Sequence, residues 1–385
     1  MQRTTLPNKR PPCEDGKAEG WEKTNTPSGE VWTRQLTQEE RAYNELQKAH
    51  YPDGRVESFF RILKAPADIG KEEAALLKKS FLDERHYTLL LDETGMVLTP
   101  DGRVLCILLK HRLPPDLLEA VRPVVREAAR EPIAGGNRGE AAGTGMVKRI
   151  RPDGTESNIN GVPNEEDLDD EHYYILKPAK GGTFGFNARE IRGGQPEGCR
   201  TTAYDGVLPE EWGLMSELAQ EVGEAFRWSF VQDKWGVQFE KACQTPPAFV
   251  LETPDGPTPF TTVTCNKSFR TAAHVDKGDL KEGFGAMCCL GDFEGCDLVL
   301  PRYKVAVRYR DGDVLLADVA NQVHGNTPLL NPDGTVPELH RMPERLACVF
   351  YCRKNMYKCL NSEEEENEAI SNRKPGDPLW PKKKS

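Results

Sequence analysis

Short apolar segments separated by tight turns fill the C-terminal part of the chain. They lie at residues 261–266, 269–276, 284–293, 297–301, 303–309, 313–319 and 346–352. Their length and their content of β-branched and aromatic residues are typical of strands, and the Asp-Gly pair within Tyr309–Val314 predicts a hairpin. Many short strands joined by turns predict a β-sandwich or a double-stranded barrel.

The part of the chain before these strands mixes strands with helices. Tyr87–Leu109 has the texture of strands and turns, and Leu113–Arg130 predicts a helix with prolines in its first turn. Leu208–Trp228 predicts an amphipathic helix, because apolar residues recur at every fourth position. These residues are Leu214, Leu218, Val222 and Phe226. Thr37–His50 predicts a short helix with Thr37 as its N-cap.

Polar segments divide the chain into regions. Residues 1–58 are rich in Pro, Gly, Lys, Glu and Thr, so we expect them to be disordered apart from the short helix. Residues 59–361 should form one domain, with a strand-rich core at 261–360 and a long glycine-rich loop region at 131–200. We expect residues 362–385 to be a mobile tail with acidic and basic stretches.

Composition and charge narrow the class of protein. The chain has 385 residues, 51 of them basic and 61 acidic, for a net charge of −10. No segment nears the ~18 apolar residues of a membrane-spanning helix, and the N-terminus lacks a secretory apolar stretch, so we expect an intracellular protein without membrane contact. Residues 165–171 and 363–368 hold six and five acidic residues and no basic one. The remainder is near neutral, which is compatible with nucleic-acid binding.

The eleven cysteines form no Cys-x-x-Cys pair and have no zinc-finger spacing. Several lie in apolar runs, such as Cys288, Cys289 and Cys348. We therefore expect reduced cysteines that pack as small core residues.

Candidate metal ligands lie in the strand-rich part. His274 and Asp276 are two residues apart, so a strand would point both side chains to one face. His324 follows a later apolar segment and can reach that face from an antiparallel strand. Two imidazoles and one carboxylate bind Fe(II) and leave positions open for a co-substrate and O₂.

The last predicted strand begins and ends with an arginine. The residues that share one of its faces are Arg345, Ala347, Val349, Tyr351 and Arg353. A 2-oxoacid that chelates iron needs a cation for its distant carboxylate, and a planar guanidinium suits it, so Arg345 is the candidate. Arg353 lies roughly 26 Å further on at ~3.3 Å per residue, so we expect it at the opposite end, near the barrel mouth.

Three segments together resemble the ten-eleven-translocation and J-binding-protein (TET/JBP) dioxygenases, in their microbial, algal and phage-like branches. The segments are HVDKGDL, HGNTP and RLACVFYCRKNM, and the resemblance is clearest over Thr261–Cys359. It implies an α+β fold with a double-stranded β-helix (jelly-roll, cupin-like) core and helices packed outside. It also implies Fe(II) held by His274, Asp276 and His324, and 2-oxoglutarate bound by Arg345.

The resemblance further implies a substrate and a base pocket. The family oxidises the methyl group of 5-methylpyrimidines in nucleic acid, here 5-methylcytosine in DNA, with the base flipped out of the helix. Asp279 falls where relatives place an acid that contacts the base, and Asn137 is a further candidate for the pocket. Relatives commonly carry a histidine where this chain has Arg353, and residues 329–344 form an insertion.

Candidate phosphate contacts lie in the glycine-rich loops. They are Arg138, Lys148, Arg149 and Arg151, with Arg189, Arg192 and Arg200 further along. The expected partner is DNA that contains 5-methylcytosine, the expected assembly is a monomer, and the terminal PKKKS would suit nuclear import in a eukaryote.

Several alternatives stay open at this point. Some algal relatives are thought to use ascorbate instead of 2-oxoglutarate and to attach a glyceryl group. The same barrel also serves protein or small-molecule hydroxylases, and a barrel can bind ligand without turnover. RNA in place of DNA, and thymine or N6-methyladenine in place of 5-methylcytosine, are open as well.

Overall fold

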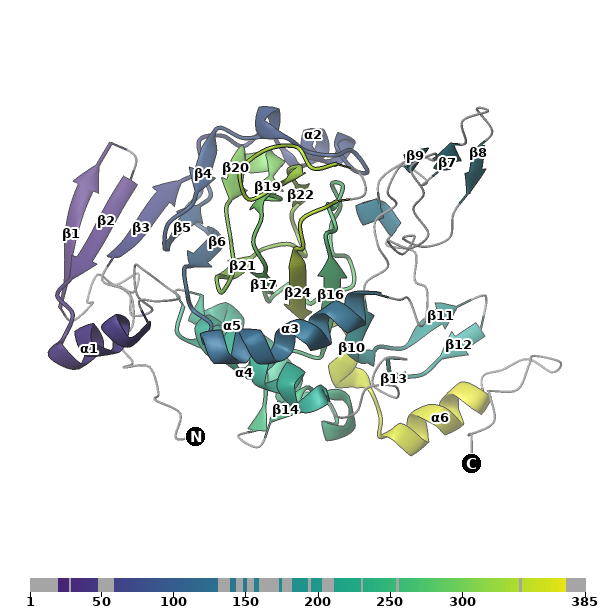
Figure 1. The fold of residues 1–385 in the computed structure, drawn as a ribbon. Coiled ribbons are helices and arrows are strands. Elements are labelled where there is room, and N and C mark those ends of the chain that lie inside the picture. The colour runs from purple at the N-terminus through teal and green to yellow at the C-terminus, as the bar shows by residue number, and fades with distance from the viewer. Residues whose placement is uncertain are drawn as a thin grey trace.

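The structure is a computed structural model of the chain. It describes residues 20–27, 29–47, 59–130, 139–142, 148–150, 156–158, 173–174, 182–192, 195–202, 211–229, 231–253, 256–338 and 341–371. Two β-sheets face each other in this part of the chain, and helices cover the outer face of the larger sheet (Figure 1). This is the expected double-stranded β-helix core within an α+β fold.

The larger sheet has eleven strands in the described residues, and all neighbours are antiparallel except β3 and β5. In spatial order they are β1 (Trp21–Thr26), β2 (Gly29–Arg34), β3 (Phe59–Lys64), β5 (Gly95–Leu98), β6 (Val104–Leu109), β21 (Val314–Ala317), β17 (Gly285–Leu290), β24 (Leu346–Tyr351), β16 (Thr262–Lys267), β10 (Gly182–Asn187) and β13 (Arg200–Thr201). The last strand in the sequence, β24, therefore lies inside the sheet, between β17 and β16.

The smaller sheet closes the barrel. Its order is β22 (Gly325–Asn326), β19 (Leu298–Leu300), β20 (Val305–Val307) and β4 (Leu89–Leu91). Short strands outside the two sheets pair among themselves. They are β7 (Lys148–Ile150), β8 (Glu156–Asn158) and β9 (Tyr173–Tyr174); β11 (Glu190–Arg192) and β12 (Gln195–Glu197); β14 (Glu252–Thr253) and β15 (Gly256–Pro257); and β18 (Glu294–Gly295) and β23 (Leu329–Leu330).

Six α-helices occur in the described residues. They are α1 (Gln38–Gln47), α2 (Lys71–Leu76), α3 (Pro115–Arg130), α4 (Trp212–Arg227), α5 (Gln232–Gln244) and α6 (Ser362–Ser371). The predicted apolar face of α4 is confirmed, since Leu218, Val222 and Phe226 are fully buried. Together with α3 this face packs on the outer side of the larger sheet, so the opposite side of the sheet is free to line the barrel interior.

The N-terminal region differs from its prediction. The short helix is present as α1, where the Thr37 hydroxyl accepts from the Glu40 N–H and the Glu40 carboxylate accepts from the Thr37 N–H. The prediction of disorder is wrong for residues 21–34, which form the β1–β2 hairpin at the edge of the larger sheet (Figure 1). Polar composition hid this hairpin, because only a few side chains, among them Trp21 and Trp32, are buried.

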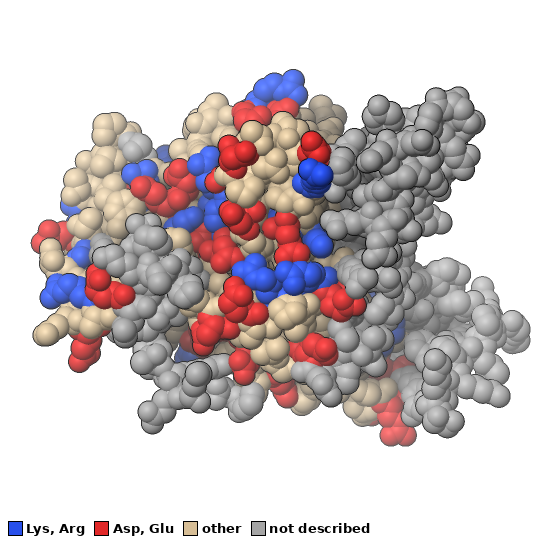
Figure 2. Space-filling view, in the orientation of Figure 1, with Lys and Arg blue, Asp and Glu red and all other residues tan. Residues whose placement is uncertain are grey.

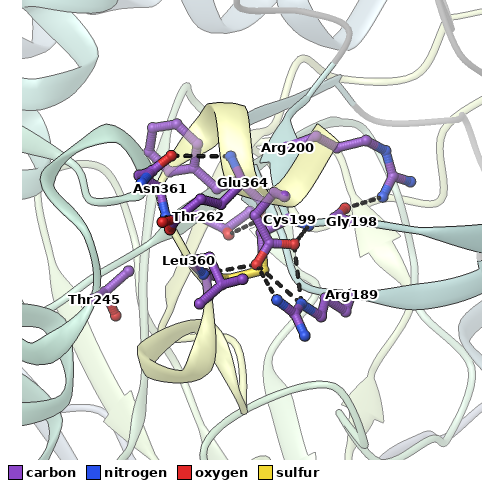
Figure 3. The surroundings of a disulfide bond; sticks show 12 residues. Arg189, Gly198, Cys199, Arg200, Thr245, Thr262, Leu360, Asn361 and Glu364 are labelled. Atoms are coloured by element: carbon purple, nitrogen blue, oxygen red, sulfur yellow. Dashed lines mark hydrogen bonds and ion pairs between the residues drawn. A yellow bond between two sulfur atoms is a disulfide. The ribbon is translucent and has the colours of Figure 1, made fainter. Parts of the chain in front are cut away.

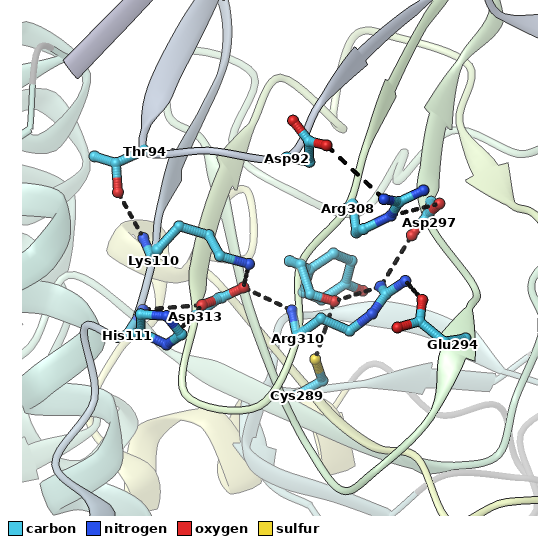
Figure 4. A network of polar contacts seen from close by, with 11 residues as sticks. Asp92, Thr94, Lys110, His111, Cys289, Glu294, Asp297, Arg308, Arg310 and Asp313 are labelled. Carbon is cyan, nitrogen blue, oxygen red and sulfur yellow. Dashed lines mark hydrogen bonds and ion pairs between the residues drawn. The ribbon is translucent and has the colours of Figure 1, made fainter. Parts of the chain in front are cut away.

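The Asp-Gly turn does not form the predicted hairpin. It joins β20 of the smaller sheet to β21 of the larger sheet, so the chain crosses the barrel there. The fully buried carboxylate of Asp313 fixes the crossing (Figure 4), accepting from Lys110 Nζ at 2.6 Å and from the backbone N–H of Arg310 at 2.7 Å. Turn chemistry alone cannot say which sheet the next strand will join.

The C-terminal segment is also more ordered than predicted. Residues 362–371 form α6, and Glu365 within the acidic run is 1% exposed. Its carboxylate accepts from Arg189 and from the backbone N–H groups of Cys199 and Leu360, at 2.7–3.0 Å (Figure 3). Arg189, a candidate phosphate contact, therefore serves to hold this helix.

A disulfide joins Cys199 to Cys359 beside this cluster, so the expectation of reduced cysteines is wrong for this pair. The fold brings the two together across 160 residues of sequence, which no local spacing could reveal. The prediction of small buried core residues is confirmed for Cys106, Cys265, Cys288, Cys289, Cys296, Cys348 and Cys352.

On the face shown in Figure 2, acidic and basic side chains of the described residues are interspersed, so neither sign of charge dominates. None of the helices within the described ranges is long and apolar enough to cross a membrane.

Candidate active site

His274, Asp276 and His324 meet inside the barrel. Their three candidate ligand atoms all lie within 4.8 Å of one another. Asp276 is central, with its Oδ1 3.3 Å from His274 Nε2 and its Oδ2 3.5 Å from His324 Nε2. The predicted strand over residues 269–276 is reduced to an isolated bridge, in which the backbones of His274 and His324 exchange two hydrogen bonds of 2.8 and 2.9 Å. This bridge sets the two imidazoles side by side.

Each imidazole is oriented by a backbone carbonyl. His274 Nδ1 lies 2.8 Å from the Ala272 oxygen, and His324 Nδ1 lies 3.1 Å from the Gln322 oxygen. A proton on Nδ1 donates to that carbonyl and leaves the Nε2 lone pair facing Asp276, as a metal ligand requires. Burial acts to raise the pKa of Asp276, but the imidazoles of His324 and His274, when they are protonated, lower it below its ordinary value. Two neutral nitrogens and one carboxylate form a donor set that fits Fe(II).

A cavity of about 450 Å³ extends from these ligands along β24. The five residues predicted to share a face of this strand all line it, from Arg345 to Arg353. Residues of the opposite face, such as Leu346, Cys348 and Phe350, are buried in the outer core against the helices. The period-two pattern therefore predicted one wall of the cavity correctly.

Arg345 lies at one end of this wall and is 3% exposed. Its Nη2 donates to the Tyr309 hydroxyl, and its guanidinium carbon lies 5.3 and 5.4 Å from the ring centres of Tyr309 and Phe293. Its Nε is buried without a partner, and no carboxylate among the described residues pairs with the guanidinium. A buried cation without a counter-ion is costly, so this pocket fits an anionic ligand such as the far carboxylate of a 2-oxoacid.

Asp279 and Arg353 lie together at the other end of the wall. They form an antiparallel bridge, and the Leu280 N–H donates to the Cys352 oxygen at 2.8 Å. Burial and the nearby Asp276 carboxylate raise the pKa of Asp279 well above its ordinary value, while the charge of Arg353 acts in the opposite direction. Arg353 Nη2 reaches the Tyr351 hydroxyl at 3.4 Å, so the pair and Tyr351 present donors and acceptors to one part of the cavity.

The candidates in the glycine-rich region are only partly described. Lys148 and Arg149 lie in β7, whereas Asn137, Arg138 and Arg151 lie outside the described residues.

The neighbouring turn Gly139–Ala142 does reach the cavity. Glu140 lines it, and the Ala141 oxygen accepts from the Ala272 N–H at 2.9 Å. No pattern in the sequence pointed to Glu140. Tyr309 could have been found, because it closes a predicted strand that faces the barrel interior.

Comparison with known proteins agrees with this geometry. Residues 192–354 match the Tet_JBP family model, described as the oxygenase domain of the 2OGFeDO superfamily. The bifunctional helicase and thymine dioxygenase JBP2 of Leishmania infantum is 43% identical over 100 residues, which cover 26% of this chain and 8% of that protein. The thymine dioxygenase JBP1 of Trypanosoma brucei brucei is 31% identical over 156 residues, which cover 40% of this chain and 17% of that protein.

The chain thus spans less than a fifth of the length of these curated relatives. A solved structure described as NgTET1 in complex with 5mC DNA is 12% identical, with a TM-score of 0.43 over 78% of this chain and 99% of that chain. The matched segment contains all three metal-ligand candidates, Arg345 and Arg353. Residues 192–354 are thus similar to the oxygenase domain of the TET/JBP family, in agreement with the resemblance of the sequence motifs.

Proposed function

We propose that the chain is an Fe(II)- and 2-oxoglutarate-dependent dioxygenase that oxidises the 5-methyl group of 5-methylcytosine in DNA. The observation that carries this proposal is the arrangement along β24. A three-residue metal set and a buried, counter-ion-free Arg345 open into the same cavity as the polar pair Asp279 and Arg353. One cavity then has a place for metal, for a dianionic co-substrate and for a planar polar substrate.

The residues would divide the work as follows. His274, Asp276 and His324 would hold Fe(II), and Arg345 with the Tyr309 hydroxyl would bind the far carboxylate of 2-oxoglutarate. With both bound, the site supplies an oxidant that uses O₂ and the decarboxylation of the oxoacid to hydroxylate a methyl group. The backbone carbonyls behind the two imidazoles hold their orientation.

The base would be held at the Asp279 end. A flipped cytosine presents its exocyclic amine as a donor, which Asp279 can accept, and its ring nitrogen and carbonyl oxygen as acceptors, to which Arg353 can donate. A duplex target must be flipped to reach this cavity, because the methyl group otherwise lies in the major groove. We further propose that the enzyme acts as a monomer on DNA and, in a eukaryotic cell, in the nucleus.

Thymine is the second candidate substrate, since the JBP relatives are named as thymine dioxygenases. Thymine has a carbonyl oxygen where cytosine has the amine, so a charged Asp279 would repel it, whereas the protonated form that the raised pKa of Asp279 favours would donate to it. Duplexes with 5-methylcytosine or with thymine alone separate the two substrates.

The test is nucleoside mass spectrometry after incubation with Fe(II), O₂ and either 2-oxoglutarate or ascorbate. We expect 5-hydroxymethylcytosine with 2-oxoglutarate. A glyceryl adduct with ascorbate alone would replace the proposed co-substrate, and unchanged 5-methylcytosine in DNA and RNA under both conditions would overturn the proposal. A hydroxylated thymine product would keep the enzyme class and correct the base.

A further inference from the structure

Lysines from three separate chain segments gather at the Asp279 end of the cavity. Lys277 follows the metal ligand Asp276, Lys354 follows Arg353, and Lys78 and Lys79 follow helix α2. None of the four lies in the glycine-rich region where phosphate contacts were predicted. Their positions follow from how the barrel brings these segments together.

Lys277 and Lys354 are adjacent in space. The Lys277 side chain lines the cavity, is 62% exposed, and has its Nζ 2.8 Å from Glu140 Oε1. The exposed Lys354 donates from Nζ to the Lys277 oxygen at 2.7 Å, and its backbone N–H donates to the Gly278 oxygen at 3.0 Å. Two ammonium groups are thereby fixed beside the backbone that carries Asp276 and Asp279.

Lys79 lies beside the start of the segment that carries the metal-ligand candidates His274 and Asp276. Its backbone N–H donates to the Ala273 oxygen at 2.7 Å, directly before His274. Its φ of 68° is a left-handed conformation that a lysine rarely adopts, so the fold holds this residue in place. The hydrogen bond from Lys277 lowers the pKa of Glu140, and the charges of Lys78 and Lys79 lower it further.

The acids that line the cavity are Glu140, Asp276 and Asp279, and Asp276 belongs to the metal set while Asp279 is buried. Glu140 is therefore the acid of the cavity lining that pairs with an exposed lysine, Lys277. Lysine ammonium groups on extended stems suit phosphate as point charges and tolerate any base sequence.

We propose that Lys79, Lys277 and Lys354 form a phosphate-binding rim that holds the sugar–phosphate backbone of duplex DNA while its target base occupies the cavity. The inference rests on the proposed function and deepens it by naming where the duplex lies. Glu140 competes with phosphate for Lys277, so it limits the affinity of the rim.

Binding of a fluorescein-labelled duplex with one 5-methylcytosine, followed by anisotropy over a range of salt concentrations, tests the rim. In the variant K79Q/K277Q/K354Q we expect roughly tenfold weaker binding or more, and a salt slope shallower by up to about 2.7, since each lost phosphate contact removes about 0.9. K79R/K277R/K354R should keep the slope, and K23Q/K64Q/K234Q, whose lysines lie in β1, β3 and α5 and outside the three segments of the rim, should match the unmodified protein.

Glu140→Gln gives an effect of opposite sign. Removing this charge frees Lys277, so binding should tighten while the slope stays or steepens. An unchanged slope in the triple glutamine variant, or a loss no greater than in the control triple, would overturn the rim. Failure of the proposed function is distinguishable, because it appears as unmodified DNA by mass spectrometry while duplex binding still depends on these lysines.

Discussion

The two ends of β24 carry the same residue type in opposite surroundings. At one end Arg345 is almost fully buried between two aromatic rings. Among the described side chains, its guanidinium hydrogen-bonds only to the Tyr309 hydroxyl. At the other end Arg353 is half-buried, bridges to Asp279 and precedes the exposed Lys354. The buried Arg345 forms a closed end of the cavity that suits a small anion of fixed shape. Asp279 and Arg353 form an open end beside exposed lysines, which suits one nucleotide of a long polyanion. One strand can thus separate co-substrate from substrate.

The largest loss of turnover should come from removing one of the metal-ligand candidates, which lie between the two ends of β24. Asp276→Ala deletes the carboxylate that both imidazoles face, so turnover should fall to background and Fe(II) binding, followed by isothermal titration, should be lost. Asp333→Asn, on an exposed turn, is the control. Retained turnover in the Asp276 variant would show that Asp276 does not bind the metal, and that the two ends of β24 do not flank a metal site.

Arg345→Ala tests the closed end. Loss of one partner of a buried charge pair costs roughly 3 kcal/mol, so KM for 2-oxoglutarate should rise about 100-fold while the affinity for duplex DNA stays unchanged. Steady-state kinetics with varied 2-oxoglutarate measure this split. Arg353→Ala is the matched control, with unchanged KM for 2-oxoglutarate. Equal effects of the two alanine variants on this constant would mean that the ends do not have separate roles.

Arg353→His tests the open end by introducing the histidine that relatives commonly carry. The preference for 5-methylcytosine over thymine should change about tenfold, because a bidentate base contact is worth roughly 1–3 kcal/mol of discrimination. The measurement is the ratio of kcat/KM for two duplexes that differ only at the target base. A ratio that matches the unmodified enzyme would show that Arg353 does not read the base.

The smallest effect on turnover should come from Glu365→Gln, which loosens helix α6, the helix that follows Arg353 in the sequence. At pH 7 we expect a loss of about 1–3 kcal/mol in the free energy of unfolding, because a buried carboxylate loses its charge-assisted bonds to Arg189 and two backbone N–H groups. KM for 2-oxoglutarate should not change. Urea unfolding of both proteins measures the difference.

The pH dependence of that difference has a definite sign. Burial acts to raise the pKa of Glu365, but Arg189 and the backbone donors lower it below its ordinary value. A lowered folded-state pKa stabilises the protein above the unfolded value of about 4.3, and this contribution is lost as the pH falls through the folded value. The gap between Glu365 and its glutamine variant should therefore shrink in acid. A gap that is constant down to pH 3 would show that packing, not charge, holds α6.

Local patterns predicted β24 and its neighbourhood well. Alternation placed five residues on the cavity wall because side chains in a strand alternate between two environments, here cavity and outer core. The two-residue spacing of His274 and Asp276 also predicted correctly that their side chains point to the same place, even though only an isolated bridge forms there.

Other features depend on contacts that no window of sequence contains. The buried carboxylate of Glu365 is paired with Arg189, which is far away in the sequence. The disulfide likewise requires Cys199, just before β13, to lie beside Cys359 near the C-terminus. The Asp-Gly turn is present at Gly312, with its φ of 78°, yet the strands it joins belong to different sheets. The lysine rim likewise arises from three segments that meet only in the fold.

The interior position of β24 has a consequence for folding. Thr262 pairs with Tyr351 and Ala286 pairs with Phe350, so both neighbours of this strand must wait for a partner made much later. Until then β16 and β17 each expose an unpaired edge, and such edges invite association with other chains. Closing long loops of this kind is slow. The wall of the cavity that β24 provides can therefore be completed only after this last strand has been synthesised.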